Sequence, residues 1–256
     1  MSAAGDMLRA EGLVKRFGGL AATDHASLAV RIGELHALIG PNGAGKTTLI
    51  HQLSGVLAPT EGSIHFAGRE ITRLPVHERA RLGLVRSYQI TSVFRRLSVL
   101  DNLALAVLAR DGGGLGLWRP ARADHARYEA AAVMAGRVGL SARQDRMAGT
   151  LSHGEQRQLE IGLALALRPR LLLLDEPLAG MGPDESERMV ALLQGLRGEV
   201  SMLLVEHDMD AVFRLADRIS TLVSGRVIAT GTPDEIHAHP DVQRAYLGDD
   251  FGRGVP

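Results

Sequence analysis

The stretch from Glu34 to Ile50, ELHALIGPNGAGKTTLI, limits what this chain can fold into more than any other. A short apolar strand runs into a glycine-rich turn and then a helix, and Gly40, Gly45, Lys46 and Thr47 match G-x-x-x-x-G-K-[ST]. Glycines let the backbone fold around an anion, and the first N–H groups of the helix have no partner within it. The pattern therefore predicts a phosphate-binding loop, with Lys46 on the β- and γ-phosphates and the Thr47 hydroxyl on Mg²⁺.

The alternative for this stretch is an ordinary glycine turn between a strand and a helix. Arg outnumbers Lys 27 to 2, yet a Lys stands where a compact ammonium fits and a planar guanidinium would not. We therefore favour the phosphate-binding interpretation. The residues expected to line the loop are Gly40, Pro41, Asn42, Gly43, Ala44, Gly45, Lys46, Thr47 and Thr48.

The composition excludes several other classes of protein. The formal charge is zero, so no excess of basic residues points to nucleic acid or to a lipid surface. Cysteine is absent, which excludes disulfides and thiolate metal sites and suits a reducing cytosol. The longest apolar runs fall far below the roughly 20 residues of a spanning helix. We expect a soluble chain, so any membrane crossing would belong to another subunit.

Three further stretches carry polar residues at places that suit a phosphate site. Ser152 and Glu155 in LSHGEQ fit a capping box, and the same helix start, with Gly154, leaves N–H groups open to an anion. Asp175 and Glu176 follow a buried strand, Leu171 to Leu174, where a solvated acidic strand end is the alternative. His207 follows another such strand, and on its position alone a structural histidine is equally expected.

The remaining chain predicts the architecture. We expect an α/β nucleotide-binding core with a mostly parallel sheet, an N-terminal antiparallel part over residues 8–30 and a helical insertion over residues 90–165. Leu49, Leu53 and Leu57 would pack one helix on the sheet, and Leu159, Leu163 and Leu167 would face inward from another. Near the C-terminus we expect a strand pair around Gly225, a turn over 230–235 and a short helix over 242–247. Phe17 is a strand aromatic, a type more often found in a core than stacked on a base.

Taken together, the motifs resemble those of the ATP-binding subunits of ABC transporters. GPNGAGKT, a strand ending in Gln89, LSHGEQ, LLLLDEP and EHD appear in that family's order over about residues 7–248. The resemblance implies one ATPase domain over 7–248, with 7–89 and 166–248 as the catalytic core and 90–165 as the helical subdomain. LSHGEQ is the discriminating motif, because many nucleoside triphosphatases carry the phosphate loop and the LLLLDEP-type strand without it.

The resemblance also implies roles for individual residues. Phe17 would face adenine, while Thr47, Gln89 and Asp175 would hold Mg²⁺. Glu176 would polarise the attacking water and His207 would contact the γ-phosphate. The residues Ser152, Gly154 and Glu155 would bind ATP held by a second ATPase subunit, identical or different.

The partners implied are a membrane permease, which the segment after Gln89 would touch, and indirectly an extracytoplasmic substrate-binding protein. The expected location is the cytoplasmic face of the inner membrane. A closer resemblance is to the larger ATPase subunit of branched-chain amino acid importers, through FGGLAAT, an insertion near 112–119, AGMGPDE and the tail after Gly231. Tyr88, His153 and Met181-Gly182 depart from that pattern, and the last change lies in the loop that would meet the other subunit.

Other functions stay open at this point. Importers of urea or amides and lipopolysaccharide exporters use the same ATPase. Soluble ABC ATPases of DNA repair or translation usually carry a long coiled coil or two ATPase domains, and this chain has neither pattern. A small-molecule kinase would need a lid and an acceptor site, and would leave LSHGEQ without a role.

Overall fold

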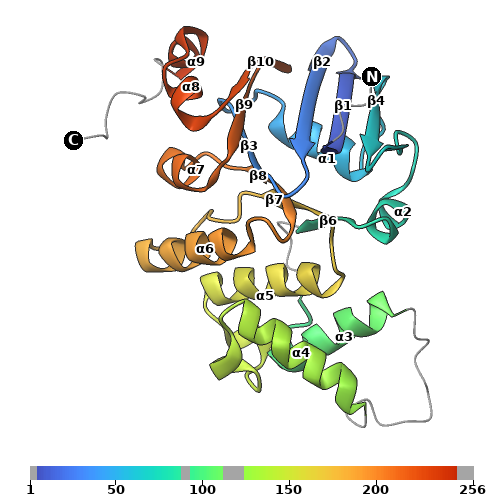
Figure 1. Cartoon of the computed structure of the whole chain (residues 1–256), viewed down its shortest axis with the longest axis vertical. Helices are drawn as coiled ribbons and strands as arrows, with labels where there is room; N and C mark the ends of the chain where they lie inside the picture. The colour runs from blue at the N-terminus through green and yellow to red at the C-terminus, as the bar shows by residue number, and fades with distance from the viewer. Residues whose placement is uncertain (1–4, 88–92, 112–123, 247–256) are drawn as a thin grey trace. The chain divides into compact units, whose positions relative to one another are not determined.

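The computed structural model describes residues 5–87, 93–111 and 124–246 (Figure 1). The chain divides into two compact units, each described by itself. The first unit contains residues 1–84, 170–176 and 197–256, and the second contains residues 85–169 and 177–196.

The first unit carries the strands and five of the helices. Its strands are β1 (Asp6–Phe17), β2 (Leu20–Arg31), β3 (Leu35–Ile39), β4 (Glu61–Phe66), β5 (Arg69–Glu70), β7 (Leu171–Asp175), β8 (Ser201–Val205), β9 (Arg218–Val223) and β10 (Arg226–Gly231), and β6 (Leu84–Ser87) begins in it. Its helices are α1 (Lys46–Ser54), α2 (Val76–Arg81), α7 (Met209–Leu215), α8 (Pro233–His237) and α9 (Pro240–Tyr246).

Two sheets form in this unit, as the sequence predicts. The antiparallel sheet has the order β2-β1-β4-β5, with Gly18 and Gly19 at the turn between the first two strands. The other sheet has the order β10-β9-β3-β8-β7 within the unit, where β3 lies parallel to both β8 and β9 and only β10 runs antiparallel. Every residue of β3, β7 and β8 is buried, as expected for parallel strands covered on both faces.

Helix α1 lies at the centre of the core, in contact with β1 and β2 of one sheet and β7 of the other. Leu49, Ile50 and Leu53 are fully buried there. Gly55 ends the helix in the left-handed conformation, so Leu57 falls beyond it and is only half-buried, and its expected place on the helix is wrong.

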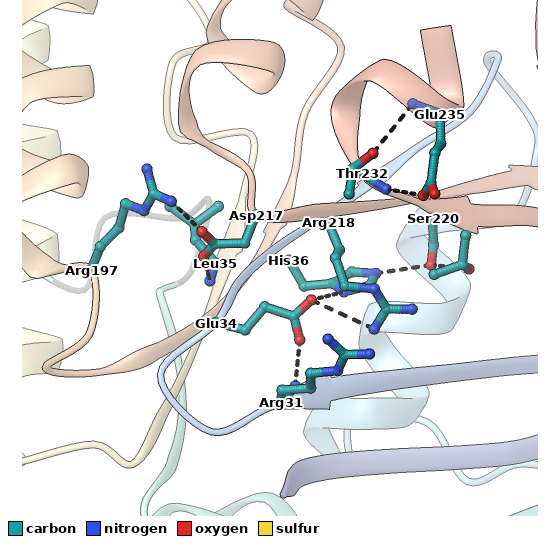
Figure 2. A network of polar contacts seen from close by, with 11 residues as sticks. Arg31, Glu34, Leu35, His36, Arg197, Asp217, Arg218, Ser220, Thr232 and Glu235 are labelled. Carbon is teal, nitrogen blue, oxygen red and sulfur yellow. Dashed lines mark hydrogen bonds and ion pairs between the residues drawn. The ribbon is translucent and has the colours of Figure 1, made fainter. Parts of the chain in front are cut away.

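A buried polar network fixes the start of β3, at the end opposite the phosphate loop (Figure 2). The His36 ring joins Glu34 through Nδ1 at 3.0 Å and Ser220 through Nε2 at 2.8 Å. The second carboxylate oxygen of Glu34 accepts the backbone N–H of Arg31 at 2.5 Å. These bonds satisfy polar groups that would otherwise be costly to bury.

The second unit is helical in its described part. It contains α3 (Val99–Arg110), α4 (His125–Arg137), α5 (His153–Ala166) and α6 (Pro183–Leu196), with short 3₁₀ turns at Ser141–Arg143 and Ala148–Thr150. Side-chain caps begin three of the helices, from Ser98, Asp124 and Ser152.

The buried face of α5 differs from the expected one. Leu159 is fully buried, but Leu163 and Leu167 are only half-buried. The face turns toward Gly162, where an added Cβ would lie 3.1 Å from Leu103. Packing follows the small residue because it lets α3 approach closely, which the leucine spacing alone did not indicate.

One C-terminal prediction is also wrong. The segment expected as a turn over 230–235 contains a capping box, in which Thr232 and Glu235 cap each other and open helix α8. The sequence T-x-x-E carries that signal.

Candidate nucleotide-binding site

The glycine-rich loop joins β3 to α1, and two of its glycines are required by close packing. A Cβ on Gly40 would lie 2.1 Å from the carbonyl oxygen of Leu222. Gly45 has a φ of +104°, and a Cβ there would lie 2.2 Å from the carbonyl oxygen of Ala22. No side chain fits at either position, so the loop holds the one shape that these contacts allow.

Helix α1 begins without the side-chain cap that most helices of the described chain have. Its N-cap is Gly45, which supplies no side-chain cap, and no acidic residue lies in the first turn. By contrast, Ser152 caps α5 and Asp208 caps α7. The positive end of α1 is therefore available to an anion.

Lys46 lies at the start of α1 and is nearly buried. Its Nζ donates to the carbonyl oxygens of Gly40 at 2.5 Å and Pro41 at 3.1 Å. Burial lowers the pKa of the ammonium, while the negative charges of Glu176 and Asp175 act in the opposite direction. The ammonium of Lys46 therefore interacts electrostatically with both carboxylates of the Asp175–Glu176 pair.

The strand order explains why these charges meet. β3, β8 and β7 are neighbours, and Val205 of β8 pairs with Leu38 on one side and Asp175 on the other. The phosphate loop, His207 and the Asp175–Glu176 pair therefore follow the carboxyl ends of three adjacent parallel strands (Figure 1). In open α/β sheets ligands bind at such an edge.

The two carboxylates differ in their surroundings. Asp175 is buried at the last position of β7. Glu176 has a φ of +48°, a left-handed conformation that non-glycine residues rarely adopt, and its N–H bonds to the carbonyl of Val205 at 2.8 Å. Strain of this kind is concentrated at functional sites, and nothing in the sequence indicated it.

His207 follows the end of β8 and carries an exposed imidazole, whose Nδ1 lies 3.6 Å from the carboxylate of Glu206. Its side chain is 62% exposed, and its backbone N–H donates to the carboxylate of Glu206 at 2.9 Å. The ring is therefore free of the core packing that a structural histidine would have.

Phe17 ends β1 and is 52% exposed, so it does not take the core position that a strand phenylalanine usually has. The ammonium of Lys15 lies 5.7 Å from the ring centroid. Stacking of Phe17 on a base stays a prediction.

Tyr246, at the end of α9, is a residue of this site that the sequence did not indicate. Its hydroxyl accepts a hydrogen bond from the backbone N–H of Gly40, and burial raises the pKa of the phenol. The last described helix thereby contacts the phosphate loop directly.

The LSHGEQ motif lies in the second unit. Ser152 accepts the N–H of Glu155 and the Glu155 carboxylate accepts the N–H of Ser152, which confirms the capping box. Ser152 also donates to Glu185, a contact that the sequence did not indicate. Gln89, Tyr88 and the insertion over 112–119 lie outside the described residues.

Two family models match the chain. The model for ABC transporters matches residues 23–179, and the model for branched-chain amino acid ATP-binding cassette transporters matches residues 226–252. The second match contains the helix that carries Tyr246.

Relatives of similar length match over nearly the whole chain. The high-affinity branched-chain amino acid transport ATP-binding proteins LivG of Salmonella typhimurium and BraF of Pseudomonas aeruginosa are each 42% identical, over 95% of this chain and 98% of theirs. The lipopolysaccharide export system ATP-binding protein LptB of Acidithiobacillus ferridurans is 38% identical, over 96% of this chain and 98% of its own.

Solved structures agree with these relatives. A nucleotide-free ATP-binding cassette from an ABC transporter has a TM-score of 0.83 and 30% identity, covering 95% of this chain and all of that one. A cassette in its ADP conformation has a TM-score of 0.83 and 31% identity, covering 95% and 99%. These likenesses confirm the expected α/β nucleotide-binding fold, and the chain belongs to the ATP-binding proteins of ABC transporters.

Proposed function

We propose that this chain is the ATP-hydrolysing subunit of an importer for branched-chain amino acids, working as a pair with a second ATPase subunit. The observation that carries the proposal is the row of strand ends on β3, β8 and β7, which brings Lys46, His207 and the Asp175–Glu176 pair to one edge of a sheet. The cargo assignment is supported by the match over residues 226–252 and by the names of LivG and BraF.

In this proposal the phosphate loop holds ATP by its backbone. Backbone N–H groups of residues 42–48 surround the phosphates, the ring of Phe17 covers adenine, and Lys46 exchanges its contacts with Gly40 and Pro41 for phosphate oxygens. The uncapped start of α1 supports this role because it supplies N–H donors and a favourable dipole.

The oxygen donors near the loop suit Mg²⁺. Within the described ranges, no group of three or more His, Cys, Asp or Glu side chains could hold a metal by itself. Mg²⁺ is usually bound through one or two carboxylates, with phosphate, water and neutral oxygens completing its coordination. Thr47 and Asp175 would supply these oxygens, with Gln89 as a third donor, and the ion would neutralise phosphate charge.

Hydrolysis is assigned to Glu176 and His207. Glu176 follows β7 in a left-handed backbone conformation, and its charge acts on Lys46, which suits a base placed beside the phosphates. The exposed imidazole of His207 would donate to the γ-phosphate and stabilise the charge that develops there.

Ser152, Gly154 and Glu155 are assigned to the ATP of the other subunit. Ser152 has a hydroxyl proton to donate, and Gly154 presents an N–H in the first turn of α5. Two subunits would then enclose two ATP molecules and separate after hydrolysis, which would drive alternating exposure in the permease. The domain proposed for this work is residues 7–248, with 90–165 as its helical part.

The docking surface proposed for the permease lies in the second unit. Phe94 is 60% exposed and Met147 58% exposed, on two segments joined by backbone bonds such as Gly149 N–H to the Arg95 carbonyl at 3.0 Å. The buried side chain of Asn102 bonds both N–H and carbonyl of Phe94 and so fixes the first segment. Exposed apolar side chains on a fixed support are typical of a protein contact.

The proposed location is the cytoplasmic face of the membrane, with the spanning done by the permease. No helix in the described residues is long and apolar enough to cross a bilayer. An extracytoplasmic binding protein would act through the permease, and we propose no nucleic-acid partner. Lipopolysaccharide export is the second candidate, favoured by the 38% identity to LptB.

The test replaces the proposed base. Glu176→Gln should still bind ATP, lose turnover by at least about a hundredfold, and accumulate a dimer that depends on ATP. Turnover and sedimentation would be measured together, and unchanged hydrolysis would remove Glu176 from its role.

Membrane proteins that copurify with the chain, identified by mass spectrometry, would decide between the two cargo classes.

A further inference from the structure

The donors assigned above to the partner's ATP are occupied in this chain by one of its own carboxylates. The Oγ of Ser152 donates to Oε1 of Glu185 at 2.8 Å, and the N–H of Gly154 donates to the same oxygen at 3.2 Å. One anionic oxygen thus accepts hydrogen bonds from a hydroxyl and a backbone N–H. An oxygen of the γ-phosphate would have to accept the same two bonds.

The fit of this carboxylate is close. A Cβ on Gly154 would lie 2.8 Å from both Cδ and Oε1 of Glu185, so only glycine leaves room for the group. The hydrogen bond from Ser152, and further bonds from the backbone of Gly154 and Gly182, lower the pKa of Glu185. The group on the motif is therefore an anion at neutral pH.

A simpler explanation accounts for only part of this arrangement. Glu185 is the third residue of α6, and its bond to the backbone of Gly182 is an ordinary N-terminal cap. That cap does not require the contacts with Ser152 and Gly154, which lie on α5. Ser152 already caps α5 by accepting the N–H of Glu155, and its remaining hydroxyl proton goes to Glu185.

We propose that Glu185 is an internal competitor for the γ-phosphate, a carboxylate that occupies the motif until ATP on the partner subunit displaces it. This inference rests on the proposed function, in which Ser152 and Gly154 bind that phosphate. A carboxylate and a phosphate oxygen carry the same sign and need the same donors, so they exclude one another. The contact therefore raises the ATP concentration needed for two subunits to associate, because part of the binding energy is spent in displacing Glu185.

The variant that isolates this effect is Glu185→Gln. Glutamine serves at the third position of a capping box, so the α6 cap is retained while the negative charge is removed. The matched control is Asp184→Asn, the same change of charge at the adjacent, exposed residue. Within the described part of the chain, no hydrogen bond joins Asp184 to Ser152 or Gly154.

The measurement is the ATP concentration for half-maximal dimer formation, followed by sedimentation velocity in a Glu176→Gln background. Since the contact is charge-assisted but exposed, we expect Glu185→Gln to lower that concentration about threefold to tenfold. Asp184→Asn should leave it unchanged. If Glu185→Gln needs an equal or higher ATP concentration, the proposal that Glu185 competes with the γ-phosphate is overturned, because the carboxylate would then not oppose dimer formation.

Two further arms separate this inference from the proposed function. Ser152→Arg should abolish ATP-dependent association; if it associates like its parent, the assignment of the motif fails and the competitor fails with it. In the nucleotide-free single chain, Glu185→Gln should speed hydrogen exchange at the Gly154 amide by about threefold or more. Unchanged exchange would overturn the contact even if the dimer forms as proposed.

Discussion

Arg79 is a buried cation that supports the phosphate-binding helix from its far end. Its guanidinium donates to the carbonyl oxygens of Gln52 and Leu53 at 2.8 and 2.7 Å, and to those of Thr72 and Leu74 at 2.9 and 2.8 Å. The first two carbonyls belong to the last turn of α1, where the regular helical donors run out; the Gln52 carbonyl also accepts the N–H of Gly55 at 3.2 Å. We predict that Arg79→Met destabilises the first unit and weakens ATP binding.

The magnitude follows from two opposing effects. Burial lowers the pKa of Arg79 from 12.5 to about 10, so desolvating the cation costs about 3 kcal/mol. Its four hydrogen bonds, at a lower bound of about 1.5 kcal/mol each, contribute about 6 kcal/mol. Methionine removes both, so the net loss of unfolding free energy is about 3 kcal/mol, within the range seen when a buried charge loses its partners.

The assay is equilibrium unfolding in urea, followed by far-ultraviolet circular dichroism, together with ATP binding by titration calorimetry. Arg81→Met, on the same helix but exposed, is the control and should change stability by less than about 0.5 kcal/mol. A loss below about 1 kcal/mol for Arg79→Met would refute the reasoning, because the four carbonyls would then be satisfied without the guanidinium.

Two other predictions concern contacts of β3 and its loop. Tyr246→Phe removes the acceptor for the Gly40 N–H and should weaken ATP binding about threefold. The control Tyr128→Phe loses a bond to Asp101 in the second unit and should leave ATP binding unchanged. If calorimetry shows that both variants weaken ATP binding equally, the contact between Tyr246 and Gly40 is contradicted. For Glu34, burial raises the pKa, but the bonds from His36 and the Arg31 N–H together with nearby positive charge hold it below 4.5. The stability it contributes is thus present above pH 4.5 and lost as the pH falls through the lower folded pKa. Urea midpoints of wild type should converge on those of Glu34→Gln below that pH, and a constant gap would rule out this role.

The phosphate loop and the strand ends were predictable because local chemistry determines them. Gly40 and Gly45 belong to the local pattern G-x-x-x-x-G-K-[ST], and the apolar run Leu171–Leu174 between Pro169 and Asp175 favours a short buried strand. Asp175 therefore had to lie at the carboxyl edge of the sheet. That Asp175 lies near Lys46 depends on the order of the strands in the sheet. The order of the motifs along the chain indicated this arrangement, whereas the hydrophobic periodicity did not.

The contacts that escaped prediction join residues far apart in the chain. Arg79 reads as part of a charged surface helix, since its burial depends on carbonyls brought by α1 and by residues 72–74. Glu185 and Ser152 meet only because α6 begins beside α5. The half-buried Leu163 shows the same limit, because Gly162 decides which face of α5 packs.

The central claim is that each ATP site takes its phosphate loop from one subunit and its LSHGEQ motif from the other. The direct measurement mixes Lys46→Ala and Ser152→Arg chains in equal amounts and follows ATP hydrolysis, with each variant alone as reference. Each variant alone should be inactive. About half of the dimers in an equal mixture contain one chain of each kind, and one of the two sites in such a dimer pairs an intact loop with an intact motif. About a quarter of wild-type activity should therefore return. The wild type must first be shown to hydrolyse ATP as a dimer. If the mixture is then no more active than its components, both elements of each site lie in the same chain and the account is contradicted.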